Sequence, residues 1–262
     1  MFQIKGKVTV FLALVALFVD TEVSAKDFAM PYIPLPLGPP AAQSSRTNAQ
    51  AIAERYDAFR HRIKKGVAAA GKEKSMLCAG CHGEFGISID PLIPNLAGQY
   101  DNYIMKQVLN FQDGGRSNGI MSAMASTINV DDLFDVAAYY ASQKKMEGDG
   151  GAENRLGREL FLNSEISDMG LACINCHGER GFGLKPRISA FPVIGGQQKE
   201  YIRKQLTDFR DGNRTNTPNY IMNRMAISLT DDQIESLADY LSTQQSKIPS
   251  ASSGLQQTTE TR

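Results

Sequence analysis

The sequence predicts an all-α protein built from two tandem helical domains, and three observations support this prediction. The stretch "AGQYDNYIMKQVLNFQDGGRSN" at 97–118 aligns without a gap with "GGQQKEYIRKQLTDFRDGNRTN" at 195–216, and half of the aligned positions are identical. Apolar residues in both stretches recur at helical spacing. No alternating run of apolar and polar residues is long enough to indicate a strand. The chain of 262 residues therefore contains a duplicated helical unit.

The first helix of each unit covers 100–111 and, in the second unit, 199–209. A glycine follows each helix, at Gly114 and Gly212, and is the expected stop signal. The spacing puts four residues on one apolar face of each helix. They are Tyr103, Ile104, Val108 and Phe111 in the first unit and Tyr201, Ile202, Leu206 and Phe209 in the second.

A further helix follows in each unit, at 129–143 and at 230–244. Both begin with acidic residues, which stabilise a helix amino terminus through its dipole. Thr230 and Gln233 have the spacing of a capping box. The repeated unit thus ends in a helix in both places.

All four cysteines lie in two C-x-x-C-H motifs, "CAGCH" at 78–82 and "CINCH" at 173–177. A disulfide within either motif would close a strained loop, and a thioredoxin-like pair needs no following histidine. A zinc ribbon expects its two cysteine pairs about 15–20 residues apart, whereas 91 residues separate Cys81 from Cys173. C-x-x-C-H is the signature of c-type haem attachment, in which both thiols bond to the haem and the histidine binds its iron. We therefore expect two covalent haem c groups, attached at Cys78, Cys81, Cys173 and Cys176 with His82 and His177 as axial ligands.

The beginning of the chain, 1–25, has the pattern of a secretory signal peptide. Lys5 and Lys7 precede a mostly apolar run at 8–19, and small residues lead to a cleavage site after Ala25. A retained membrane anchor is the alternative, but the apolar run is shorter than the about 20 residues that span a bilayer. Export to the periplasm agrees with covalent cofactor attachment in an oxidising compartment.

The offset between the two units is nearly constant, which defines their extent. It is 95 residues at the C-x-x-C-H motifs, 98 in the aligned stretch and 101 at the methionines described below. We call residues 66–146 the first copy and residues 153–247 the second copy. The segment "EGDGGA" at 147–152 is expected to be a short flexible linker between them.

Residues 26–65 and 248–262 lie outside the two copies. The former contains the proline-rich stretch "MPYIPLPLGPP" followed by an amphipathic helix at 48–66, and the latter is a polar tail expected to be disordered. The formal net charge of the chain is zero, yet residues 26–65 hold seven Lys or Arg against three Asp or Glu. This basic segment could orient the protein on an acidic partner or a membrane surface.

The sixth iron ligand separates an electron carrier from a haem enzyme, because a methionine closes the iron and raises its potential. The first copy reads "IMSAMASTINVDDL" and the second "IMNRMAISLTDDQI", with the methionines in a loop before the final helix. The alternative is that these methionines only fill core space. Spacing does not distinguish between the two aligned pairs, Met121 with Met222 and Met124 with Met225.

Two further pairs recur near the haem motifs. A carbonyl of Pro94 or Pro192 could accept a hydrogen bond from the axial histidine, although an ordinary turn proline explains both positions equally well. Arg116 and Arg214 are either partners of a haem propionate or ion-pair partners of Asp113 and Asp211. All of these residues are therefore candidates for supporting the site rather than for binding iron.

Over roughly residues 66–245 the chain resembles the cytochrome c4 family of periplasmic dihaem proteins. The resemblance lies in both C-x-x-C-H motifs, "LAGQ" and "GGQ", "YIRKQLTDFRDGNRTN" and "YIMNRMAISLTDDQI". It implies two class I cytochrome c domains, Met121 and Met222 as axial ligands, and terminal oxidases or a quinol-oxidising complex as partners. The chain departs from the family in its longer amino-terminal section, 26–65, and in a shorter loop before Met121.

These features predict a respiratory dihaem electron carrier that converts no substrate itself and has redox proteins, not nucleic acid, as partners. The first alternative is a haem enzyme, or an electron-entry subunit such as a dihaem peroxidase, which needs an iron with an exchangeable sixth ligand. The second alternative is a membrane-anchored docking subunit, which needs an uncleaved signal.

Overall fold

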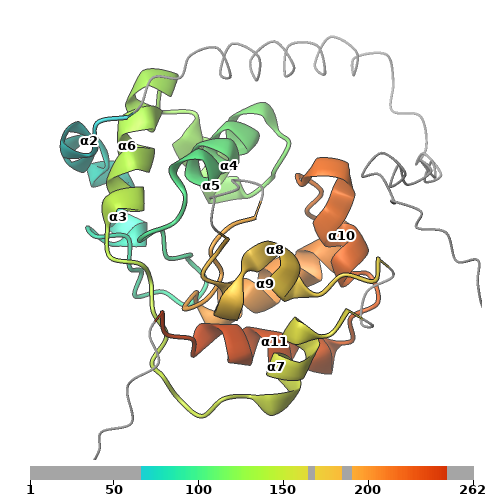
Figure 1. The fold of residues 1–262 in the computed structure, drawn as a ribbon. Coiled ribbons are helices and arrows are strands. Elements are labelled where there is room, and N and C mark those ends of the chain that lie inside the picture. The colour runs from blue at the N-terminus through green and yellow to red at the C-terminus, as the bar shows by residue number, and fades with distance from the viewer. Residues whose placement is uncertain (1–65, 165–168, 185–190, 247–262) are drawn as a thin grey trace, which may run out of the picture. The chain divides into compact units, whose positions relative to one another are not determined.

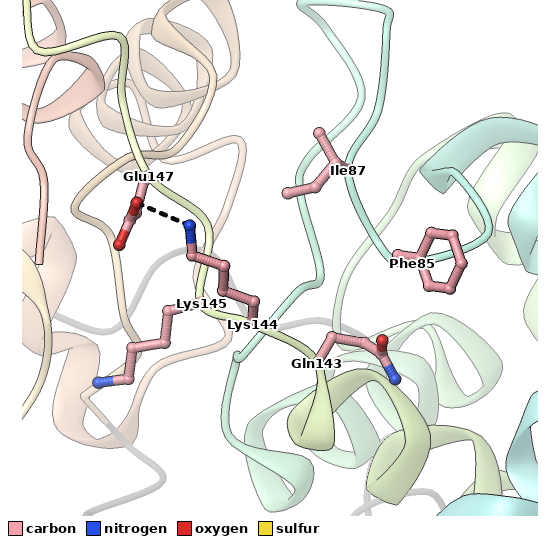
Figure 2. A pocket seen from close by; sticks show the side chains of 6 residues that line it. All are labelled: Phe85, Ile87, Gln143, Lys144, Lys145 and Glu147. Atoms are coloured by element: carbon pink, nitrogen blue, oxygen red, sulfur yellow. Dashed lines mark ion pairs between the residues drawn. The ribbon is translucent and has the colours of Figure 1, made fainter.

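The computed structural model describes residues 66–164, 169–184 and 191–246, and all regular elements within these ranges are helical (Figure 1). The all-α prediction is confirmed for this part of the chain. None of the described helices is long and apolar enough to cross a membrane. The predicted signal peptide at 1–25, the proline-rich and amphipathic segment at 26–65 and the tail at 248–262 lie outside the described residues.

The helices follow the same order in both copies (Figure 1). The first copy contains α2 (Ala68–Lys74), α3 (Met76–His82), α4 (Asp101–Asp113), α5 (Gly119–Ala125) and α6 (Val130–Ser142). The second copy contains α7 (Arg155–Leu162), α8 (Cys173–His177), η2 (Glu179–Gly181), α9 (Lys199–Arg210), η3 (Pro218–Tyr220), α10 (Ile221–Ala226) and α11 (Asp231–Ser242).

The core of the first copy is organised around α6, on which α2 and α4 pack. Leu133, Ala137 and Tyr140 are completely or almost completely buried on this helix. α2 approaches closely because Gly71 has no side chain: a Cβ there would lie 1.9 Å from the carbonyl oxygen of Asp135. Each large apolar side chain buried in this way stabilises the fold by roughly 1.5–3 kcal/mol.

The core of the second copy has the same plan around α11, which packs against α7 and α9. Gly157 of α7 permits the close approach here, since a Cβ would lie 2.0 Å from the carbonyl oxygen of Ser236. Ile234, Leu237 and Leu241 of α11 are buried in this cluster. All the residues of the cluster come from the second copy, so this copy has a hydrophobic core of its own.

The predicted final helices are confirmed, and the structure adds a side-chain cap on the first of them. Asn129 caps α6 by accepting a 2.8 Å hydrogen bond from the Asp132 backbone N–H. At α11 the Thr230 hydroxyl accepts from the Gln233 N–H at 3.2 Å, and the Gln233 side chain accepts from the Thr230 N–H at 2.9 Å. The predicted capping box is therefore complete.

The predicted helix stops are also confirmed. Gly114 is the C-cap of α4 with φ 78°, and Gly212 follows the C-cap of α9 with φ 77°. Both glycines adopt the left-handed conformation, which other residues adopt only with strain.

The predicted apolar face of α4 is only partly correct. Ile104 and Phe111 are buried, but Tyr103 contacts the second copy, where its hydroxyl accepts a 3.1 Å hydrogen bond from Arg214. Spacing alone could not reveal a polar neighbour from another helix. The structure adds Met105 and Leu109 to the first core, and Val108 and Leu206 pack against the two cores from partly buried positions.

The methionine segments are short helices, α5 and α10, so the expectation of loops there is wrong. Asn118 starts α5 by accepting a 2.9 Å hydrogen bond from the Met121 N–H. The second copy has extra residues at this point, and Asn219 and Tyr220 there have φ values of 52° and 53°. Such conformations are unfavourable for residues other than glycine, so the insertion is accommodated with local strain.

The expected flexible linker is held in place in the structure. Gly148 N–H donates to the Gln244 carbonyl at 2.7 Å, and Gly150 N–H donates to the Thr243 carbonyl at 3.2 Å. Residues 147–152 therefore run beside the end of α11, an arrangement that their composition does not indicate.

Candidate functional site

Each C-x-x-C-H motif lies on a short helix, α3 in the first copy and α8 in the second. Cysteines three positions apart on a helix project from the same side, and all four thiols are free. Burial raises the pKa of the Cys78 thiol and raises that of Cys173 to about 11. These thiols are protonated at neutral pH, unlike the low-pKa thiols of redox-active pairs.

The histidine that follows each cysteine pair is buried and oriented by a proline carbonyl. His82 and His177 are each 6% exposed. Nδ1 of His82 lies 2.9 Å from the Pro94 carbonyl oxygen, and Nδ1 of His177 lies 2.9 Å from that of Pro192. A carbonyl can only accept, so Nδ1 carries the proton and Nε2 keeps its lone pair. Burial lowers the pKa of both histidines, which favours the neutral form that binds metals.

A glycine follows each histidine because the chain turns sharply there. Gly83 has φ 79° and Gly178 has φ 74°. A Cβ at Gly83 would lie 2.1 Å from the Ile87 carbonyl oxygen, and one at Gly178 would lie 2.2 Å from the Gly183 carbonyl oxygen. The turn returns the chain toward the proline that contacts the histidine, so glycine is part of the site.

The candidate methionines lie on the short helices between the middle and final helices of each copy. Met121 and Met124 lie on α5, and Met222 and Met225 lie on α10, all with half-buried side chains. Met222 packs against the core cluster of the second copy, as Cys173 does. The second copy thus places an attachment cysteine and a candidate thioether against the same core.

The two candidate arginines meet where the copies contact each other. Arg116 donates to Gln107 Oε1 at 2.8 Å, to the Tyr201 hydroxyl at 3.0 Å and to Gln205 Oε1 at 2.7 Å. Arg214 donates to the same two glutamines, at 3.1 Å and 2.7 Å. Each guanidinium also lies over a phenylalanine ring of its own copy, Phe111 or Phe209, within 4.8 Å.

Neither proposed aspartate partner makes the predicted ion pair among the contacts of the described residues. Asp113 accepts from the Gly115 backbone N–H at 2.8 Å, and Asp211 pairs with Arg210 at 2.9 Å. The hydrogen bonds of Arg116 and Arg214 instead go to neutral side chains.

Lys106 adds a third cation to this region. Its ammonium group donates to Asn110 Oδ1 at 2.9 Å and to the backbone carbonyl of Asn216. Burial, followed by the charges of Arg214 and Arg116, lowers the pKa of Lys106 to about 8. Lys106, Arg116 and Arg214, which we call the cationic cluster, therefore lie together among neutral hydrogen-bond acceptors.

Sequence reasoning missed the polar residues that surround this cluster. Gln107 is buried on α4 in the first copy, and Gln205 occupies the matching position on α9 in the second. The sequence did contain a signal, because both copies have a glutamine at this aligned position, 98 residues apart. A polar residue that recurs among apolar positions of both helices indicates a specific hydrogen-bonding role. Tyr103 and Tyr201 carry the same signal, although their helical spacing predicts a place on the apolar faces.

Comparisons with known proteins agree with this fold and motif arrangement. The family model for cytochrome c matches residues 155–245. Cytochrome c4 of Pseudomonas aeruginosa is 39% identical over 180 residues, covering 67% of this chain and 88% of the relative. The thiosulfate dehydrogenase electron acceptor of Thiomonas intermedia is 33% identical over 182 residues, covering 67% and 82%. The crystal structure of reduced cytochrome c4 from Pseudomonas stutzeri has a TM-score of 0.63 at 37% identity, covering 69% of this chain and 100% of that one.

The helical fold and the paired attachment motifs define a c-type cytochrome, an electron carrier with covalently bound haem c. The chain belongs to the cytochrome c4 family. The family resemblance and the helical class I fold predicted from the sequence are confirmed.

Proposed function

We propose that the chain is a periplasmic carrier of single electrons with two haems, each closed by a histidine and a methionine. The first haem is attached at Cys78 and Cys81 and the second at Cys173 and Cys176. The axial ligand pairs are His82 with Met121 and His177 with Met222. The haem supplies the one-electron chemistry, while the protein holds the iron in one ligand set and excludes exchangeable ligands.

The observation that supports this proposal most is the repeated geometry at the histidines. In both copies a buried imidazole follows two helical thiols and has its Nδ1 2.9 Å from a proline carbonyl. That hydrogen bond fixes the tautomer and increases the donor strength of Nε2. Because both copies have it, we propose that both are redox centres.

We also propose that the cationic cluster neutralises haem propionates. Burying positive charge without an anionic hydrogen-bond partner is unfavourable, and among the described residues the hydrogen bonds of Lys106, Arg116 and Arg214 go to neutral acceptors. The propionate carboxylates of the two haems would supply negative charge to these three cations. The cluster would thereby hold a propionate-bearing edge of each haem near the contact between the copies.

For partners, we propose a terminal oxidase as acceptor and a quinol-oxidising complex or a periplasmic dehydrogenase as donor. The relative from Thiomonas intermedia, described as a thiosulfate dehydrogenase electron acceptor, supports a dehydrogenase as one kind of donor. The basic segment at 26–65 is proposed to assist docking.

The decisive experiment is a potentiometric titration of the mature protein in the visible region, with and without carbon monoxide. We expect two low-spin haems whose spectra and reduction potentials do not change when carbon monoxide is added. A large spectral change in one haem would instead support the haem-enzyme alternative. Amino-terminal sequencing of the same sample should begin near Lys26, whereas an intact first residue would support the membrane-anchored alternative.

A further inference from the structure

The side chain of Asn223 ties the methionine helix of the second copy, α10, to the end of α9 and the loop that follows it. Its Nδ2 group donates to the Phe209 carbonyl at 2.7 Å and to the Arg214 carbonyl at 2.8 Å. Carbonyl oxygens only accept, so the amide has one possible orientation. Asn223 follows Met222 directly in the chain, and the two hydrogen bonds therefore hold the backbone beside the proposed thioether ligand.

The other side of the same amide has no partner. Oδ1 of Asn223 is buried and makes no hydrogen bond within the part of the chain that the structure describes. A buried polar atom without a partner is unfavourable, so an asparagine that only filled space here would be a poor choice. The two donated hydrogen bonds are what this side chain contributes.

The first copy holds its methionine helix, α5, in a different way. Ser122 occupies the position equivalent to Asn223, directly after Met121. Its hydroxyl oxygen accepts from the Asn118 N–H at 3.4 Å, which is a contact within the start of α5 itself. The start of α5 is fixed by the Asn118 cap, which accepts from the Met121 N–H at 2.9 Å.

The cap at the start of α10 is longer and follows strained backbone. The Thr217 hydroxyl accepts from the Met222 N–H at 3.3 Å, which is beyond the usual range for such a bond. Asn219 and Tyr220, between these two residues, have the positive φ values described above. Strained backbone persists only where the surrounding structure holds it, and the hydrogen bonds of Asn223 lie directly after it.

The far end of each methionine helix is held from the same position in both copies. Gln112 Nε2 donates to the Ile128 carbonyl at 2.8 Å, and Arg210, at the aligned position, donates to the Leu229 carbonyl at 3.3 Å. The two copies therefore differ at the start of the methionine helix, which is the end that carries the proposed ligand.

We propose that Asn223 is a positioning residue that keeps the Met222 thioether on the second haem iron, a role that Ser122 does not perform in the first copy. The inference rests on the proposed function, in which Met222 is the axial ligand. An iron closed by methionine binds an external ligand only in the fraction of molecules whose methionine is released. Loss of the Asn223 hydrogen bonds should raise that fraction at the second haem alone.

The test uses the complete haem-loaded chain in the ferric state and imidazole as the external ligand. The readout is the far-red absorption band of methionine-ligated haem, which imidazole removes in one step per haem. Asn223→Ala removes both N–H donors, and Asn223→Asp replaces them with oxygen at nearly the same side-chain size. In both variants imidazole should bind the second haem roughly tenfold more tightly than in the unmodified protein, with no change at the first haem. Met222→Ala lacks the band of the second haem and so assigns the two steps.

Two control substitutions separate positioning from a general loss of stability. Ser122→Ala changes the equivalent position of the first copy and should leave both imidazole affinities unchanged. Thr230→Ala removes a hydrogen bond that caps α11, so it should lower the Tm of the second copy without changing either affinity.

The possible outcomes distinguish this inference from the proposed function. Unchanged imidazole affinity of the second haem in both Asn223 variants would overturn the inference and leave the proposed function standing. An equal gain in Thr230→Ala would also overturn it, because general destabilisation would then explain the effect. If the second haem of the unmodified protein bound carbon monoxide, the proposed function would fail and the inference with it.

Discussion

The hydrogen bond between the proposed axial histidine and a proline carbonyl has the same length in both copies, 2.9 Å. Proline has no N–H, so its carbonyl is the only backbone hydrogen-bonding group it offers. The glycine after the histidine gives the chain room to turn toward that proline. The orientation of each motif histidine thus depends on a proline and a glycine outside the C-x-x-C-H motif.

The first prediction concerns which methionine of each pair binds the haem iron. If Met121 binds iron, Met121→Ala should open that iron, remove its methionine-to-iron charge-transfer band and allow carbon monoxide to bind one haem per chain. Met121→His should keep the iron closed and lower its potential, because a stronger donor favours the ferric state. The measurements are far-red absorption, gas binding and potentiometry.

Met124→Ala is the matched control in the same helix. Met124 is half-buried, so the substitution should lower the free energy of unfolding by less than the roughly 2–5 kcal/mol that is typical of a fully buried methionine. The haem spectrum should not change. If Met124→Ala removed the band and Met121→Ala spared it, the assignment would be wrong, and Met225 would replace Met222 by symmetry.

The glycine after the first histidine allows a second prediction. Gly83→Ala adds a Cβ that would lie 2.1 Å from the Ile87 carbonyl oxygen, so the chain must shift beside His82. We expect a lower yield of haem-loaded protein and a clear decrease in Tm. Gly114→Ala is the control for a positive φ, since Gly114 has φ 78° and nothing within 4 Å of the added Cβ. Its ψ is 3° whereas that of Gly83 is 151°, a region essentially restricted to glycine, so Gly83→Ala combines the contact with additional backbone strain. A similar loss in both variants would mean that the positive φ alone, and not the surroundings of Gly83, is responsible.

The elements show which local signals were strong enough to define a helix. The final helices have acidic first turns and side-chain caps, and both were predicted within one or two residues of their ends. α5 and α10 were expected to be loops because they are only one or two turns long and contain few helix signals. Helices of this length are not stable alone, so tertiary packing must decide them.

The capping box of α11 allows a prediction about the stability of a single helix. Thr230→Ala removes the oxygen that accepts from the Gln233 N–H and should destabilise the protein by about 1 kcal/mol. Denaturant unfolding followed by helical circular dichroism measures this change. Gln233→Ala keeps the Thr230 hydroxyl and should have a smaller effect. An equal or larger loss in Gln233→Ala would place the capping energy in the reciprocal bond instead.

At the scale of the whole molecule, the chain is electrically neutral but its charges are segregated. Residues 26–65 hold seven basic against three acidic residues, whereas residues 66–145 hold six against eight. Exposed charges of this kind affect association rates more than affinity. The basic segment is therefore expected to act during encounter with a partner.

Deletion of residues 26–60 tests this expectation. Electron exchange with the physiological partner should become slower at low salt, and the difference should disappear as salt screens the charges. Stopped-flow kinetics across a range of ionic strength gives both rates. An unchanged rate at every salt concentration would contradict a docking role, and unchanged potentials in the deleted protein would show that the haem domains are intact.

The helical class, the duplication, the attachment motifs and the long helices could all be predicted from the amino-acid sequence. These features depend on residue spacing and on hydrogen bonds between residues close together in the sequence. The contacts of Arg116 with Tyr201 and of Arg214 with Tyr103 across the two copies became visible only in the folded structure, as did the other partners of Asp113 and Asp211. The arginine–tyrosine contacts join residues about a hundred positions apart in the chain. The polar side chain that an arginine contacts there depends on how the two copies pack against each other. Such packing cannot be predicted from a local sequence pattern.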